Sequence, residues 1–182
     1  MKKLRLLLLD ANVVIQLIEY GLWDQVVDKC EVLLARIVIE KEVKFYRGEK
    51  QDQIIDLSPD EKAGRIRVVE VEGSDLDAFL DKFDPIYLEK LDPGEAESLT
   101  YLLTSKDQCL ICSGDAIVFR VLGLLQREHQ GISLEEVLHK VGLSRKLASQ
   151  FSKSFRDHWT KLGQQDMIRD TGLKKRPRKR RS

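Results

Sequence analysis

Apolar and polar residues follow one another along the chain in blocks that predict alternating strands and helices. Residues 4–9 are nearly all apolar, which is typical of a strand covered on both faces, and residues 66–71 alternate as a strand does. Two further strands are predicted at residues 36–39 and 109–112. Apolar residues at helical spacing predict helices over residues 12–20, 22–34, 74–83, 93–105 and 115–125. This alternation predicts an α/β fold with a central parallel sheet between two helical layers.

The pattern changes in the last third of the chain. From Ser133 onward it is purely helical, with Ser133 and Glu136 spaced as a capping box and a longer helix expected over residues 144–162. We therefore predict an α/β domain over residues 1–128, a helical C-terminal extension over residues 129–173, and a separate basic tail over residues 174–182.

Length and composition set the broad class of protein. The chain has 182 residues, of which 42% are hydrophobic, enough for one substantial core without a disulfide framework. Three cysteines make an odd number, which fits a reduced, cytoplasmic protein. No apolar stretch approaches the ~20 residues that span a bilayer, so no membrane association is expected.

The net charge of +1 conceals an uneven distribution. Residues 174–182 hold seven of the 31 Lys and Arg and none of the 30 Asp and Glu, which leaves the rest of the chain with 24 basic and 30 acidic residues and a net charge of −6. Such a tail is expected to be disordered on its own. It fits two roles equally well, attraction to nucleic-acid phosphates or a solvated aid to solubility.

Three acidic residues stand where predicted strands give way to helices. Asp10 follows the apolar strand, Glu95 lies in the first turn of the helix after Pro93, and Asp115 follows Ser113 and Gly114. In open α/β sheets the carboxyl ends of the strands form the ligand-binding crevice, so these carboxylates are expected to converge there. Packed carboxylates repel one another, and an oxygen-only ligand set suits Mg²⁺ or Mn²⁺.

Each acid taken alone also has a simpler interpretation. Asp and Glu are favoured at helix starts because they accept hydrogen bonds from free N–H groups and complement the helix dipole. Asn12 is likewise open to two interpretations, a helix N-cap or an amide that orients Asp10. The conjunction of three acids at successive junctions favours the metal site over capping alone.

These motifs resemble those of a known family. The Asp10-Ala11-Asn12 segment after a strand, Gly94-Glu95-Ala96-Glu97, and Ser113-Gly114-Asp115-Ala116 are similar to the three acidic motifs of PIN-domain nucleases, in particular the compact VapC-like prokaryotic branch. The resemblance covers about residues 4–125. It implies a three-layer α/β/α PIN-like fold, here with a C-terminal α-helical appendage.

The resemblance also implies an activity and a site. The expected function is Mg²⁺- or Mn²⁺-dependent cleavage of single-stranded RNA, as in the toxin of a toxin–antitoxin pair, with an antitoxin protein and a homodimer as further partners. Asp10, Glu95 and Asp115 become catalytic metal ligands, while Asn12 and Ser113 become supporting residues.

The chain departs from the family pattern in two places. Many relatives carry a second acid where this chain has Ser113, and a Glu in the helix after the second strand, where the expected offset falls on Tyr46. The nearest acids, Glu40 and Glu42, do not sit at that offset, and Glu42 is kept only as a minor candidate for the site. Glu97 is expected to face solvent. The departures leave an alternative function open, a catalytically weak PIN-like module that binds nucleic acid or protein.

Two other groups of residues have simpler interpretations. Cys109 and Cys112 are spaced so that a strand would point them to opposite faces, which indicates small buried hydrophobes. The aromatic residues between positions 144 and 159 alternate with basic ones, which fits either an RNA-binding face or an amphipathic helix packed on the body. The second interpretation is favoured.

Overall fold

The computed structural model describes residues 4–47 and 52–174 of the chain. The segment 175–182, which holds all of the basic tail except Lys174, lies outside the described residues. The strands are β1 (Leu4–Leu9), β2 (Cys30–Ala35), β3 (Phe45–Arg47), β4 (Asp52–Ile54), β5 (Ile66–Val69), β6 (Leu110–Cys112) and β7 (Gly131–Ile132). The α-helices are α1 (Ala11–Glu19), α2 (Trp23–Lys29), α3 (Ser58–Lys62), α4 (Gly73–Leu80), α5 (Pro85–Leu88), α6 (Pro93–Thr104), α7 (Ala116–Leu124), α8 (Leu134–Lys140) and α9 (Lys153–Ile168). Shorter helical turns are η1 (Val38–Glu42), η2 (Glu128–Gln130) and η3 (Ser149–Phe151).

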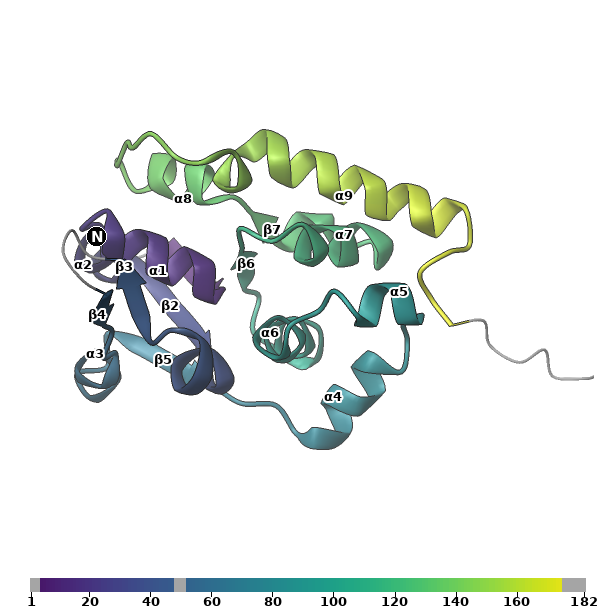
Figure 1. Ribbon diagram of the computed structural model, residues 1–182, viewed down its shortest axis with the longest axis horizontal. Coiled ribbons are helices and arrows are strands. Elements are labelled where there is room, and N and C mark those ends of the chain that lie inside the picture. Colours follow the sequence, from purple (N-terminus) through teal and green to yellow (C-terminus); the bar gives the residue numbers. More distant parts are fainter. Residues whose placement is uncertain (1–3, 48–51, 175–182) are drawn as a thin grey trace, which may run out of the picture.

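Among the described residues, five strands form a parallel sheet in the order β5-β2-β1-β6-β7 (Figure 1). The central strand β1 pairs with β2 on one side and β6 on the other. Leu7, Leu8 and Leu9 are fully buried, which explains why the run lacks the alternation of a half-exposed strand. The predicted mixed α/β architecture with a parallel sheet flanked by helices is confirmed.

Two hydrophobic cores lie on opposite faces of this sheet. Leu7 and Leu9 of β1 face a core built from α1, α2 and α8, whereas Leu8 faces a second core built from α4, α5, α6 and α7. Cys112 belongs to the first core and Cys109, just before β6, to the second, so these thiols point to opposite faces as predicted. Figure 1 shows the strands between α1 and α2 on one side and α4, α6 and α7 on the other.

The prediction was wrong between residues 22 and 39. The helix expected over residues 22–34 ends at Lys29 in α2. The apolar residues of its second half, Cys30, Leu33 and Leu34, belong to strand β2 instead. The expected strand at residues 36–39 does not form, because β2 ends at Ala35 and the π-helical turn η1 begins at Val38. β2 pairs with both β1 and β5 and is buried over most of its length, and a buried strand cannot be distinguished from a helix face by periodicity alone.

The segment from residue 129 to 173 shares the sheet and both cores. β7 pairs with β6, and Val137 and Leu138 of α8 lie in the first core. The capping box of Ser133 and Glu136 is present. The expected helix over residues 144–162 instead begins at Lys153 and continues to Ile168, because the Ser152 side chain caps its first turn by accepting from the Phe155 amide at 3.2 Å.

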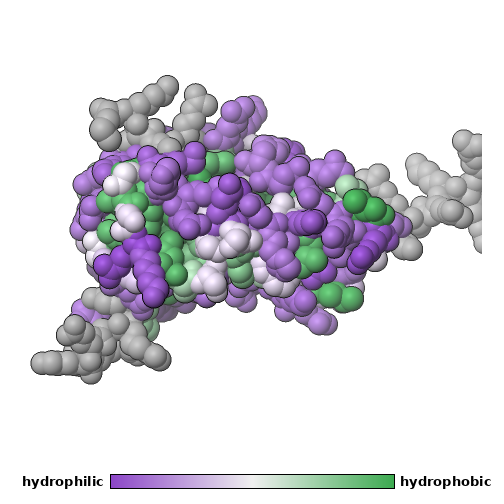
Figure 2. All heavy atoms as spheres, turned by 90° about the horizontal axis from the view of Figure 1, so that it is seen from above, coloured by the Kyte–Doolittle hydropathy of each residue, from purple (hydrophilic) through white to green (hydrophobic). Residues whose placement is uncertain are grey.

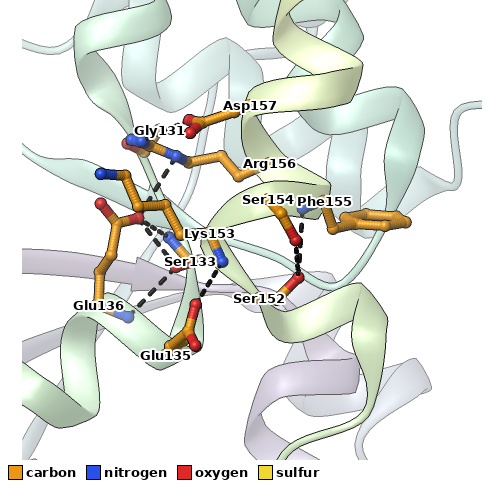
Figure 3. A network of polar contacts seen from close by, with 10 residues as sticks. All are labelled: Gly131, Ser133, Glu135, Glu136, Ser152, Lys153, Ser154, Phe155, Arg156 and Asp157. Atoms are coloured by element: carbon orange, nitrogen blue, oxygen red, sulfur yellow. Dashed lines mark hydrogen bonds and ion pairs between the residues drawn. The ribbon is translucent and has the colours of Figure 1, made fainter.

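Helix α9 is anchored to α8 at its N-terminal end. Glu135 Oε2 accepts a hydrogen bond from the Lys153 amide at 2.7 Å, and Arg156 Nη1 donates to the Gly131 carbonyl at 3.0 Å. The Arg156 guanidinium also lies 3.3 Å from Glu136, the acid of the α8 capping box (Figure 3). These contacts hold the start of α9 against the loop that carries β7.

The rest of α9 crosses α7 at close range. A Cβ atom at Gly163 would lie 1.9 Å from the Arg120 carbonyl oxygen, and one at Gly123 would lie 2.1 Å from that of Thr160. Beside this crossing, Asp166 accepts from Arg120 Nε and from the Tyr87 hydroxyl, both at 2.6 Å. The two glycines therefore permit backbone contact between the helices, and a buried polar network fixes their register.

The aromatic residues of α9 face the body of the protein. Phe155 and Trp159 pack against the second core, as the amphipathic interpretation predicted. Figure 2, seen from the side of α8 and α9, shows a largely hydrophilic face with hydrophobic residues gathered toward its two ends. In the part of the chain that the structure describes, no helix has the length and apolar character needed to cross a membrane.

Candidate functional site

The candidate site lies where the strand order reverses. After β1 the chain turns to α1 on one face of the sheet, and after β6 it turns to α7 on the other. The carboxyl ends of two parallel neighbours whose helices diverge in this way form the crevice in which open α/β sheets bind ligands. Asp10 and Asp115 are the N-cap residues of these helices.

Ser113 joins the two aspartates. Its hydroxyl donates to Asp10 Oδ2 at 2.9 Å, and its oxygen accepts from the Asp115 amide at 2.8 Å. The Asp10 amide in turn donates to the Cys112 carbonyl at 3.1 Å, which continues the β1–β6 pairing to the site. Ser113 is fully buried, so it serves here as a rigid link between the two turns.

Asp10 is almost completely buried, with 5% of its surface exposed. Its Oδ1 accepts a hydrogen bond from the Ala11 amide at 2.7 Å. The pKa of Asp10 is raised from 3.8 to about 6, chiefly by burial and to a smaller extent by the charges of Glu42 and Asp115, while the hydrogen bonds from Ser113 and Ala11 oppose the rise. The carboxylate is thus held in place at an electrostatic cost.

Glu95 lies nearby in the first turn of α6. It is 3% exposed, and its Oε2 accepts from the Asp92 amide at 3.0 Å as part of the helix capping box. Burial, followed by the charges of Asp115 and Asp10, raises the pKa of Glu95 to about 9. The predicted residues Asp10, Glu95 and Asp115 are therefore electrostatically coupled at one edge of the sheet.

The structure also brings Glu42 to this edge. Glu42 ends η1, and its Oε1 accepts from the Gly94 amide at 2.9 Å. A Cβ atom at position 94 would lie 2.2 Å from Glu42 Oε2, so glycine leaves room for this carboxylate. Burial and the charges of Asp92 and Glu97 raise the pKa of Glu42.

Glu42 lies away from the position expected for the family's glutamate because the second strand ends earlier than predicted. The offset from the second strand was counted from an expected strand at residues 36–39, but β2 ends at Ala35 and a π-helical turn follows. Position 46, where the offset pointed, lies in β3, which pairs with β4 in a separate two-stranded sheet. The better signal was Gly94, the glycine that admits the Glu42 side chain.

Two other polar residues lie differently from expectation. Asn12 is exposed in the first turn of α1 and is not its N-cap, a place that Asp10 takes. The hydrogen bonds that orient Asp10 come from Ser113 and Ala11 instead. Glu97 does not simply face solvent, because its Oε2 accepts from the Ile37 amide at 3.0 Å and joins α6 to the start of η1.

The C-terminal part of the chain closes one side of the site. Phe151 of η3 is 2% exposed and lies over Gly114, the residue between Ser113 and Asp115. A Cβ atom at Gly114 would lie 2.5 Å from the Phe151 ring. The turn that presents Asp115 is therefore held between β6 and a residue from the connection to α9.

Capping and clustering coexist in these acids. Asp10 caps α1, Asp115 Oδ1 accepts from the Ile117 amide at 3.2 Å, and Glu95 completes the α6 cap. A set of acids that offers only oxygen ligands, with the pKa raised at Asp10 and Glu95, has the chemistry of a site for a hard divalent cation. Within residues 4–47 and 52–174, however, no three His, Cys, Asp or Glu side chains are arranged to hold a metal ion. The donor chemistry fits such a cation, and the carboxylates would have to close around it.

Comparison of the chain with protein-family models, curated proteins and solved structures finds no match. The resemblance to PIN-domain nucleases therefore rests on the sequence motifs alone.

Proposed function

We propose that this protein is a PIN-like endoribonuclease that depends on Mg²⁺ or Mn²⁺ and cleaves single-stranded RNA. The observation that carries the proposal is the convergence of Asp10, Glu95 and Asp115 at the carboxyl edge of β1 and β6, with raised pKa values at Asp10 and Glu95. Helix-capping acids scattered over a surface would not raise one another's pKa, as Asp115 and Asp10 raise that of Glu95. Glu42 joins this set as a fourth carboxylate.

The strand order supports the same proposal. Asp10 and Asp115 lie at the carboxyl ends of β1 and β6, between which the strand order reverses, the place where α/β enzymes of many kinds bind substrate. The order of the motifs along the chain is the one that the family resemblance implies.

The chain's own residues would prepare the site for a phosphodiester. Ser113 donates to one oxygen of Asp10 and the Ala11 amide to the other, while the Asp92 amide donates to one oxygen of Glu95, so these hydrogen bonds orient both acids in the absence of a ligand. With a pKa of about 9, Glu95 is mostly protonated near neutral pH, whereas Asp10 is mostly ionised. When bound, a divalent cation would lower the pKa of the attacking water and neutralise negative charge on the phosphate.

A second function is favoured by a specific observation. The described residues contain no arranged metal-binding group, and each of the three predicted ligands has a capping role that explains its presence. The alternative is a catalytically weak module that binds nucleic acid or protein. We call the carboxyl edge with Asp10, Glu42, Glu95 and Asp115 the acidic edge. An antitoxin protein or a second copy of the chain is the proposed partner that would cover it.

The test is cleavage of end-labelled single-stranded RNA in Mn²⁺, Mg²⁺ or EDTA. We expect cleavage by the wild type with either metal, none in EDTA, and a loss of at least about 100-fold for Asp10→Asn and Asp115→Asn, in the range of single catalytic groups. Asp75→Asn is the matched control, because Asp75 is an exposed acid in the first turn of α4. Equal activity of all variants, or cleavage in EDTA, contradicts the nuclease and leaves the binding module.

A further inference from the structure

A cavity lies at the edge of the sheet opposite Asp10 and Asp115. It has a volume of about 580 Å³ and is lined by residues 102, 103 and 105–110, which lead into β6, and by residues 127, 129 and 130, which lead into β7. Both segments precede their strands, so the cavity sits at the amino ends of β6 and β7, away from Asp10 and Asp115. Its volume is in the range of cavities that hold small organic ligands.

The walls of this cavity are of two kinds. Leu102, Leu103 and Leu110 provide an apolar surface. Lys106, Arg127 and His129 line the cavity with groups that are or can become cationic, and all three are exposed. No ion pair joins Lys106 or Arg127 to an acid in residues 4–47 and 52–174.

The one carboxylate of the lining is already engaged. Asp107 pairs with Arg67 through Oδ2, the same oxygen accepts from the Tyr101 hydroxyl at 2.7 Å, and the Asp107 amide donates to Ser105 Oγ at 3.0 Å. With Asp107 neutralised by Arg67, the remaining charge of the cavity is positive. Glu128, between Arg127 and His129 in the sequence, is not among the lining residues.

The cavity also holds an unsatisfied polar group. Gln130 lines it, and the Gln130 side-chain oxygen is buried without a hydrogen-bond partner in the described part of the chain. Native proteins leave few buried polar atoms unpaired, and such atoms often mark a place where water or a ligand binds.

We propose that this cavity binds a nucleoside monophosphate, a ligand that combines a phosphate with a flat, largely apolar ring and hydrogen-bonding groups. Lys106 and Arg127 meet the phosphate, for which Arg supplies a planar fork of donors and Lys a point charge. The leucine wall receives the ring, and Gln130 lies beside it. This site does not depend on the proposed nuclease activity, because it shares no residue with the acidic edge.

The test is calorimetric titration of the full chain with adenosine 5′-monophosphate in EDTA, with adenosine and inorganic phosphate as separate arms. We expect one molecule of the monophosphate to bind, and both adenosine and inorganic phosphate to bind at least about tenfold more weakly, the effect of losing one charge-assisted contact or the apolar contact. Binding of adenosine or phosphate as tight as that of the monophosphate contradicts the two-part site.

Variants that lose the same number of positive charges distinguish binding in this cavity from general electrostatic attraction of the ligand to the protein. The double variant Lys106→Gln, Arg127→Gln should bind the monophosphate at least about tenfold more weakly. The control Lys146→Gln, Lys161→Gln removes two exposed cations elsewhere and should bind as the wild type does. All variants keep the seven basic residues of the tail. Equal affinity of the cavity variant and the wild type, or equal losses in the two double variants, overturns the proposal.

Discussion

At the scale of single residues, the raised pKa of Glu95 makes the stability of the protein depend on pH. The pKa of Glu95 is raised from its ordinary value of 4.5 to about 9 by burial and by its charged neighbours. The folded protein thus binds this proton more tightly than the unfolded chain does. The stability contributed by protonated Glu95 is complete below about pH 4.5 and is lost as pH rises toward 9.

Glu95→Gln should therefore stabilise the metal-free protein at high pH. Glutamine keeps an oxygen that can accept from the Asp92 amide and removes the ionisation, so we expect a gain of roughly 2 kcal/mol or more at pH 8 and little change at pH 4.5. Urea unfolding in EDTA at both pH values measures it. If the difference in unfolding free energy between the wild type and the variant is constant across this range, the pKa of Glu95 is not raised as described.

Glu42 offers a second test of the same group. Its charge raises the pKa of Asp10, so Glu42→Gln should lower that pKa below about 6. The carboxyl carbon of Asp10, followed by NMR through a pH titration, reports this change. Glu40→Gln serves as the control, because Glu40 is exposed in the same turn. If the pKa of Asp10 is unchanged in Glu42→Gln, Glu42 does not interact with Asp10 and is not part of the site.

The elements around the site were predictable where local signals agreed with the tertiary structure. The starts of α6 and α7 were visible as Pro93 and Asp115, and the parallel sheet followed from the alternation of strands and helices. The segment that forms β2 and η1 could not be predicted, because Cys30 and Leu33 fit the apolar face of a helix as well as a buried strand. Its π-helical turn depends on tertiary contacts from Glu97 and Gly94, which local sequence does not reveal.

The crossing of α7 and α9 gives a prediction about packing. A methyl group at Gly163 would collide with the Arg120 carbonyl, a backbone atom that cannot move aside, so Gly163→Ala should destabilise the protein by about 1–3 kcal/mol. Chemical denaturation measures the loss. Gly73→Ala is the control, since a Cβ atom there meets nothing within 4 Å. Equal stability of the two variants would show that the helices do not approach as closely as described.

The protein as a whole combines an acidic body with a basic C-terminal segment. The seven Lys and Arg of residues 174–182 give a strong sequence-independent attraction to phosphates if that segment meets RNA. Lys174 is itself held by its amide to the Lys82 carbonyl at 2.8 Å, so a chain ending at Lys174 keeps this contact.

Such a shortened chain should bind single-stranded RNA more weakly and with a smaller dependence on salt. The logarithm of affinity should change with the logarithm of salt concentration by ~0.7 less for each phosphate contact removed. Fluorescence anisotropy at several salt concentrations measures both quantities, using Asp10→Asn full-length protein to prevent cleavage. An unchanged slope would assign the tail to solubility rather than to RNA.

The central claim is that the acids at the carboxyl edge of β1 and β6 bind a divalent cation together. The most direct measurement is the melting temperature in EDTA and in rising concentrations of Mn²⁺. Because a ligand that binds only the folded state stabilises it by about 2.7 kcal/mol at a hundred times its Kd, the wild type should melt at a higher temperature with Mn²⁺. Asp10→Asn should lose most of this rise while melting no lower than the wild type in EDTA, whereas Asp75→Asn should keep it. No rise in the wild type, or an equal rise in Asp10→Asn, would contradict the metal site.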